Sequence, residues 1–193
     1  MTSNETNRST IGSLRELVPP RRMSPSETRQ IIERQTTRLL KLAEVEGPPV
    51  PVIDVIRALP HVEVKQIPTL PSSGRAQWSR NRWLLLVDSD EAPVRQRFSL
   101  GHELAHVIFH PLSDVVFYSL RDRTAEQWEE QACEYFAACL LMPRMWVKRA
   151  WGGGMRNVPD MARLFEVSYV SMQYRLEQIG LVERERADKR SAA

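Results

Sequence analysis

Apolar positions recur along most of the chain with the spacing of short amphipathic elements. After the starting signal Ser24-Pro25-Ser26-Glu27, a stripe of aliphatic residues predicts a helix that is ended by Gly47-Pro48-Pro49. The stripe consists of Ile31, Ile32, Leu39, Leu40 and Leu42. Later patterns predict a short helix at 50–59, a strand at 62–67, strands of a small sheet at 77–87, and an amphipathic helix at about 94–110.

The two ends of the chain differ in composition from its middle. Residues 1–24 mix Thr, Ser, Asn and Arg with a Pro-Pro pair, which is typical of a disordered arm. Residues 183–193 interleave acids and bases and are expected to be a solvated, charged tail. Between them we expect one α+β domain at 25–150 and a helical extension at 155–182, separated by a glycine-rich connection.

Composition narrows the class of protein. A chain of 193 residues with 42% hydrophobic content is long enough for one domain with a substantial core. The net charge of +3 is mild for a chain that is 26% charged, so it does not argue for nucleic-acid binding. No apolar stretch reaches the roughly 18 residues of a membrane span, and the first thirty residues show no signal-peptide core. We therefore expect a cytoplasmic protein with no membrane partner.

The run His102-Glu103-Leu104-Ala105-His106 carries the strongest chemical signal. Histidines four residues apart on a helix lie about 40° apart around its axis, so both can bind one metal ion. Glu103 lies about 100° from His102, where it can border the metal without ligating it and act as a general base. Apolar neighbours place these ionisable groups near a core, where metal ligation offsets the cost of burial. Zinc is the metal that favours such ligands.

A catalytic zinc site normally has three protein ligands, so a third must come from elsewhere in the chain. Glu130 is the candidate, and Glu129 and Glu134 are its rivals. Glu134 is one helical turn beyond Glu130 on the same face, whereas Glu129 is rotated by about 100°. His110 is a poorer candidate, because Pro111 ends the helix and His110 lies two turns, about 12 Å, from His102.

Two stretches together resemble the ImmA/IrrE family of zinc metallopeptidases. They are Arg95-Gln-Arg-Phe-Ser-Leu-Gly-His-Glu-Leu-Ala-His106 and, after Glu130, Phe136-Ala-Ala-Cys-Leu-Leu-Met-Pro143. A weaker likeness extends the resemblance over roughly residues 28–182. It implies a zincin-like, gluzincin-type core in which His102, His106 and Glu130 bind Zn²⁺ and Glu103 is the catalytic base. Glu134 stands where the family often has Asn or Asp, a position from which it could support a zinc-bound imidazole.

The resemblance also implies a function. The family is known for peptidases that cut a partner transcriptional repressor, which releases genes of mobile elements or of a DNA-damage response. We therefore expect a zinc endopeptidase whose protein substrate is a helix-turn-helix repressor. The alternative from a different class is a zinc-containing regulator that binds DNA or a repressor without cutting it. The replacement Glu103→Gln separates the two, because a structural zinc site needs no general base.

The predicted helical extension allows two interpretations. The spacing of its apolar residues fits two helices that cross as in a helix-turn-helix module. Its reading face would then carry Tyr169, Ser171 and Gln173, with Arg175 as the one basic residue. A helical pair that packs on the peptidase or grips its substrate fits the pattern equally well, and we favour that interpretation over DNA binding.

Overall fold

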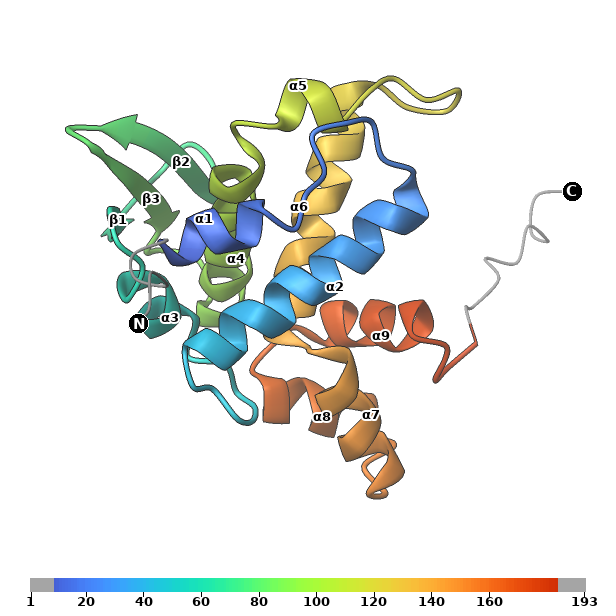
Figure 1. Cartoon of the computed structure of the whole chain (residues 1–193). Coiled ribbons are helices and arrows are strands. Elements are labelled where there is room, and N and C mark those ends of the chain that lie inside the picture. The colour runs from blue at the N-terminus through green and yellow to red at the C-terminus, as the bar shows by residue number, and fades with distance from the viewer. Residues whose placement is uncertain (1–8, 184–193) are drawn as a thin grey trace, which may run out of the picture.

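The computed structural model describes residues 9–183, which form a three-stranded sheet and nine helices (Figure 1). The strands are β1 (Val62–Ile67), β2 (Gly74–Ser79) and β3 (Arg82–Asp88). The helices are α1 (Thr10–Arg15), α2 (Pro25–Leu42), α3 (Val52–Arg57), α4 (Pro93–Phe109), α5 (Ser113–Val116), α6 (Ala125–Leu141), α7 (Arg144–Gly152), α8 (Val158–Phe165) and α9 (Tyr169–Gln178). The predicted α+β class with a small sheet is confirmed.

The sheet has the order β1-β3-β2. β1 pairs with β3 in parallel, with Val64 opposite Leu85, and β2 pairs with β3 antiparallel, with Ala76 opposite Leu85. The central strand β3 buries Leu85, Leu86 and Val87, as expected for a strand with neighbours on both sides. β2 is an edge strand of this sheet within the described residues, and it packs beside α4.

Local signals explain where α2, before the sheet, and α6, after it, begin. Ser24 caps α2 by accepting a hydrogen bond from the Glu27 backbone N–H, and Pro25 occupies the first turn. Thr124 and Gln127 form a capping box at the start of α6. The predicted start of the first helix after Ser24 is confirmed, and the helix ends at Leu42, before Gly47.

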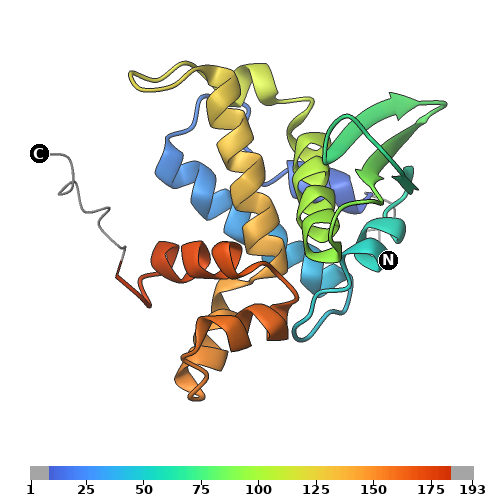
Figure 2. The same ribbon diagram turned by 180° about the vertical axis from the view of Figure 1, so that it is seen from behind.

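Helices α4 and α6 lie side by side at the centre of the molecule, and α2 crosses α6 on its other side (Figures 1 and 2). Gly101 faces Ala137 where α4 and α6 cross, and a Cβ atom at Gly101 would be 3.2 Å from both the Cα and the Cβ of Ala137. The missing side chain therefore permits the close approach of the two helices. Among the helices of the described residues, none combines the length and apolarity needed to cross a bilayer.

The prediction of a disordered arm over residues 1–24 is wrong for its later part. Residues 10–15 form α1, which Ser9 caps, and Ile11, Leu14, Val18 and Met23 are buried in the core. The Arg15 guanidinium donates hydrogen bonds to the carbonyls of Val107 and Ile108, in the last turn of α4. A few well-placed apolar residues and one arginine thus fix a segment whose composition is polar. Residues 1–8 lie outside the described part of the chain.

The predicted extension forms α8 and α9, which are joined by a short turn in which Glu166 adopts a left-handed conformation. Arg175 on α9 is fully buried. It donates to the Met142 carbonyl and pairs with Glu33 of α2 at 3.0 Å, beneath the Tyr135 ring. The one basic residue expected on a DNA-reading face is therefore part of the core. This burial supports the packing interpretation of the extension. Of the expected charged tail, residues 184–193 lie outside the described residues.

Candidate metal centre and catalytic base

Helix α4 presents both histidines of the predicted motif on one face. His102 and His106 are partly buried, and their Nε2 atoms lie 3.1 Å apart. The two Nε2 atoms therefore converge on the same point, as the spacing of four residues predicts. The Arg15 guanidinium, bonded to the carbonyls of Val107 and Ile108, fixes the end of the helix just beyond His106.

Helix α6 brings Glu130 to the two histidines. Its Oε2 lies 3.3 Å from His102 Nε2, and its Oε1 lies 3.3 Å from His106 Nε2. One ligand-type atom from each of the three residues falls within 4.8 Å of the others. Two helices that are far apart in sequence thus bring two imidazoles and one carboxylate to a single point. Glu130 is more exposed than the histidines, so this point is open to solvent on the α6 side.

Glu129 lies on the other side of His106. Its Oε1 is 3.6 Å from His106 Nδ1, and the same oxygen accepts a hydrogen bond from the Ser113 hydroxyl. These contacts with His106 and Ser113 hold the pKa of Glu129 below its usual range. A carboxylate at the ring nitrogen that faces away from a metal site fixes the orientation and tautomer of the imidazole. Glu129 therefore takes the place beside an imidazole that the family resemblance suggests for Glu134, which is exposed.

Glu103 points from α4 toward the start of β2 and is 9% exposed. A Cβ atom at Gly74 would lie 3.0 Å from Glu103 Cγ and 3.1 Å from its Oε1, so any larger residue would push this side chain aside. Burial raises the pKa of Glu103, against the opposing influence of His106 and of the Ala76 backbone. The carboxylate is therefore held in a confined position beside the edge strand, where proton uptake is favoured.

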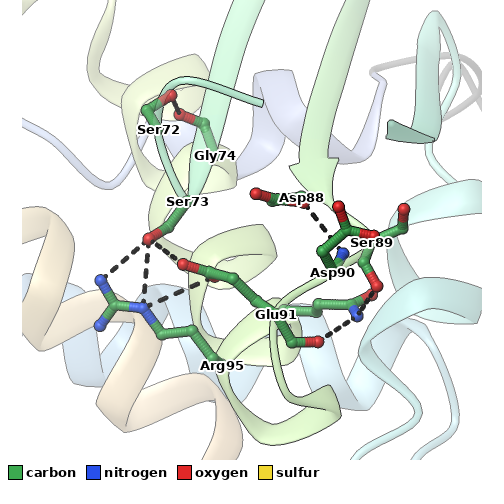
Figure 3. Close-up of polar contacts among 9 residues, drawn as sticks. Ser72, Ser73, Gly74, Asp88, Ser89, Asp90, Glu91 and Arg95 are labelled. Atoms are coloured by element: carbon green, nitrogen blue, oxygen red, sulfur yellow. Dashed lines mark hydrogen bonds and ion pairs between the residues drawn. The ribbon is translucent and has the colours of Figure 1, made fainter. Parts of the chain in front are cut away.

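A polar network fixes the segment that leads into β2 (Figure 3). The Ser73 hydroxyl donates to Glu91 Oε1 at 2.6 Å and accepts a hydrogen bond from Arg95 Nη2 at 3.0 Å. Asp88 Oδ1 accepts from the backbone N–H of Asp90, in the turn between β3 and α4. Because Ser73 immediately precedes Gly74, these contacts also set the backbone that borders Glu103. The structure thus gives Arg95 an architectural role at this turn.

Comparison with known proteins identifies the family. The sequence model described as the IrrE N-terminal-like domain matches residues 60–177, which contain both α4 and α6. The chain belongs to the ImmA/IrrE family. The predicted resemblance is confirmed, and with it the assignment to a family of metalloproteases.

Two curated relatives are each named radiation response metalloprotease IrrE. The protein of Deinococcus radiodurans is 28% identical over 130 residues, covering 64% of this chain and 39% of the relative. The protein of Deinococcus deserti is 34% identical over 102 residues, covering 49% of this chain and 36% of the relative. The chain thus spans less than half the length of these curated relatives.

A solved structure shares the fold. The chain aligns with a Mycobacterium tuberculosis transcriptional regulator with a TM-score of 0.61 and 14% identity, covering 93% of this chain and 54% of the other. At this identity the likeness concerns the fold alone.

The family implies a metal ion, and the donor set at the centre fits one. Burial, with the nearby His106 and Arg95, lowers the pKa of His102 to about 4, so its imidazole is neutral near pH 7 and offers a lone pair. Two imidazole nitrogens and a carboxylate oxygen are the ligands of many catalytic zinc sites. Among the residues that the structure describes, His102, His106 and Glu130 are the group that meets this requirement.

The structure separates the other candidates from this centre. Glu134 lies one turn beyond Glu130 and faces solvent. His110 caps α4, is exposed, and packs its ring edge-on against Trp83 with centroids 5.1 Å apart. The sequence pattern suggests a partly buried histidine near the site, and the exposure of His110 contradicts this. Arg97 donates to the carbonyls of Phe165 and Glu166 at the end of α8, so it joins α4 to the helical extension.

Proposed function

We propose that the chain is a zinc-dependent endopeptidase whose substrate is a protein partner, namely a helix-turn-helix transcriptional repressor. His102, His106 and Glu130 would hold the metal, and Glu103 would be the general base. The single observation that carries this proposal is the meeting of the three ligand-type side chains within 4.8 Å beside the confined Glu103. The repressor as substrate rests on the family and on relatives named for a radiation response.

Each residue has a defined task in the proposed reaction. A zinc ion held by His102, His106 and Glu130 would supply a Lewis acid for the scissile carbonyl and for the attacking water. Glu103 accepts the proton of the attacking water on a carboxylate oxygen and passes it to the leaving amine nitrogen. Because burial raises its pKa, the Glu103 carboxyl holds this proton more readily than an exposed glutamate would. Glu129, at His106 Nδ1, keeps the imidazole oriented.

The substrate backbone would lie extended along a strand next to the centre. Such pairing needs an edge strand, which excludes β3 because it is the central strand of the sheet. The strand available for pairing beside Glu103 is β2, which starts at Gly74. We propose that substrate pairs with β2, where unpaired backbone groups of an edge strand can bind an extended peptide.

Purified protein tests the assignment of the residues. We expect zinc to bind to wild type and to Glu103→Gln in equimolar amount, and much more weakly to His102→Ala and Glu130→Ala. The control Glu134→Ala should retain zinc, because Glu134 lies outside the three-residue centre. Hydrolysis of a library of internally quenched peptides should be lost in Glu103→Gln. Equal hydrolysis by wild type and Glu103→Gln would refute the proposed mechanism.

A further inference from the structure

A second hollow lies beside the candidate metal centre, where α2, α6 and α9 meet. In Figure 1, α9 lies near the C-terminal end of α6, next to α2. The three helices enclose a pocket of about 250 Å³, which we call the α2–α6–α9 pocket. Its apolar lining includes Ile32 of α2, and Trp128, Ala132, Ala138 and Met142 in and just after α6. All five of these residues are buried.

This pocket borders a hollow that contains Glu130, one of the three residues of the metal centre. Arg123, Gln131 and Glu134 line both the pocket and a shallower hollow that contains Glu130. From Glu130 to Ala138 the distance along α6 is about 12 Å, at 1.5 Å per residue. An extended peptide covers that distance in about four residues, at roughly 3.3 Å each. A substrate bound at the centre can therefore reach the pocket with a side chain about four residues from the scissile bond.

The rim of the pocket carries exposed apolar groups. On α9, Val170 is 74% exposed and Tyr174 is 55% exposed, and both line the pocket. Single exposed apolar residues are common, but here two of them border an apolar hollow, as is typical of a binding surface.

We propose that the α2–α6–α9 pocket selects the substrate by binding a large apolar side chain, aliphatic or aromatic, about four residues from the scissile bond. The buried apolar part of the lining favours an uncharged side chain, because a charged one would lose its hydration there. Arg29, Arg123 and Glu134 also line the pocket, but they are exposed or half-buried. Val170 and Tyr174 cover the bound side chain from the rim, and they are specificity-determining residues. The inference rests on the proposed peptidase function and adds a preference for one class of side chain.

The test uses zinc-loaded protein and a library of internally quenched peptides in which one position at a time is fixed. Wild type is compared with Tyr174→Ala and with Val170→Asp, whose new charge near the start of α9 is compatible with the helix. Tyr169→Ala is the matched control, because Tyr169 lies on α9 and is 54% exposed but does not line the pocket.

We expect wild type and Tyr169→Ala to prefer large apolar residues at one position about four residues from the cleaved bond. In Tyr174→Ala and Val170→Asp this preference should fall about tenfold, the usual effect of a lost apolar contact. Cleavage of peptides with a small residue at that position should change less, because a small side chain does not fill the pocket. This pattern would support the pocket as the selective site.

Three results would overturn the inference. Identical preferences in all four proteins would exclude the pocket while leaving the peptidase intact. If zinc-loaded wild type cleaves no peptide, the proposed function itself fails, and the pocket has no part in cleavage. If sedimentation shows that Tyr174→Ala and Val170→Asp turn a dimer into a monomer without altering the preference, the pocket holds a second copy of the chain.

Discussion

Gly101 of α4 lies directly against Ala137 of α6, with a hypothetical Gly101 Cβ only 3.2 Å from the Ala137 backbone. This contact sets the distance between the helix that carries both histidines and the helix that carries Glu130. The proposed metal centre thus depends on a residue that has no donor atom of its own.

Replacing Gly101 by valine should separate α4 from α6. We expect a loss of about 1–3 kcal/mol in the free energy of unfolding, the usual cost of overpacking, and weaker zinc binding because Glu130 moves away from the histidines. Urea unfolding and zinc titration measure the two effects. Gly152→Val is the control, since nothing lies within 4 Å of a Cβ atom at that helical glycine. Equal zinc affinity in both variants would contradict this role of Gly101.

Gly74→Ala should act on the proposed catalytic base rather than on the metal. The new methyl group would lie 3.0 Å from Glu103 Cγ, so the carboxylate must shift. We expect kcat to fall about tenfold or more, as misplaced catalytic groups do, with zinc affinity unchanged. Steady-state kinetics and zinc titration separate the two, with Gly47→Ala as the control in open space. A drop in zinc affinity without a change in kcat would argue against this assignment.

Glu129→Ala should weaken zinc binding by about 10–100-fold, the range found when an outer carboxylate is removed from a metal-bound histidine. The reason is the loss of the partner 3.6 Å from His106 Nδ1. Glu129→Gln keeps an acceptor at this position and should lose less affinity. Competition with a zinc chelator measures both variants. If Glu129→Ala binds zinc as tightly as wild type does, Glu129 does not orient His106.

Arg175→Leu should destabilise the fold. Removing one partner of a buried ion pair typically costs about 3–5 kcal/mol, and Glu33, Tyr135 and the Met142 carbonyl would all lose contacts. Arg163→Leu on the exposed surface of α8 is the control, because its side chain is 78% exposed. Chemical denaturation gives the difference. A small effect on stability combined with a loss of DNA binding would revive the DNA-reading interpretation.

The sequence reveals those parts of the centre that depend on local geometry. Histidines four residues apart must share a helical face, so the convergence of His102 and His106 follows from the helix alone. Glu130 needs the additional contact of α4 with α6, which the sequence indicated through the family resemblance. From the sequence, Glu129 is only a rival ligand. Its place beside His106 Nδ1 could not be predicted, because it depends on how α6 crosses α4.

Tertiary contacts also explain the other features of the structure that the sequence did not predict. α1 has too few apolar residues to be predicted, yet Arg15 ties it to the end of α4. The contact of Gly74 with Glu103 could not be predicted, because the two residues are far apart along the chain. From the sequence, Arg175 is the one basic residue on a possible DNA-reading face. In the structure it is buried beside Glu33.

The most direct test of the central claim is a mass-spectrometric comparison of new protein N-termini in the native host. The cells express either wild type or Glu103→Gln, before and after DNA damage, and both proteins are shown to be folded and metal-loaded. We predict new termini with wild type only, located within one helix-turn-helix repressor. The same termini with Glu103→Gln, or none with either protein under both conditions, would contradict the account and favour a regulator that does not cleave its partner.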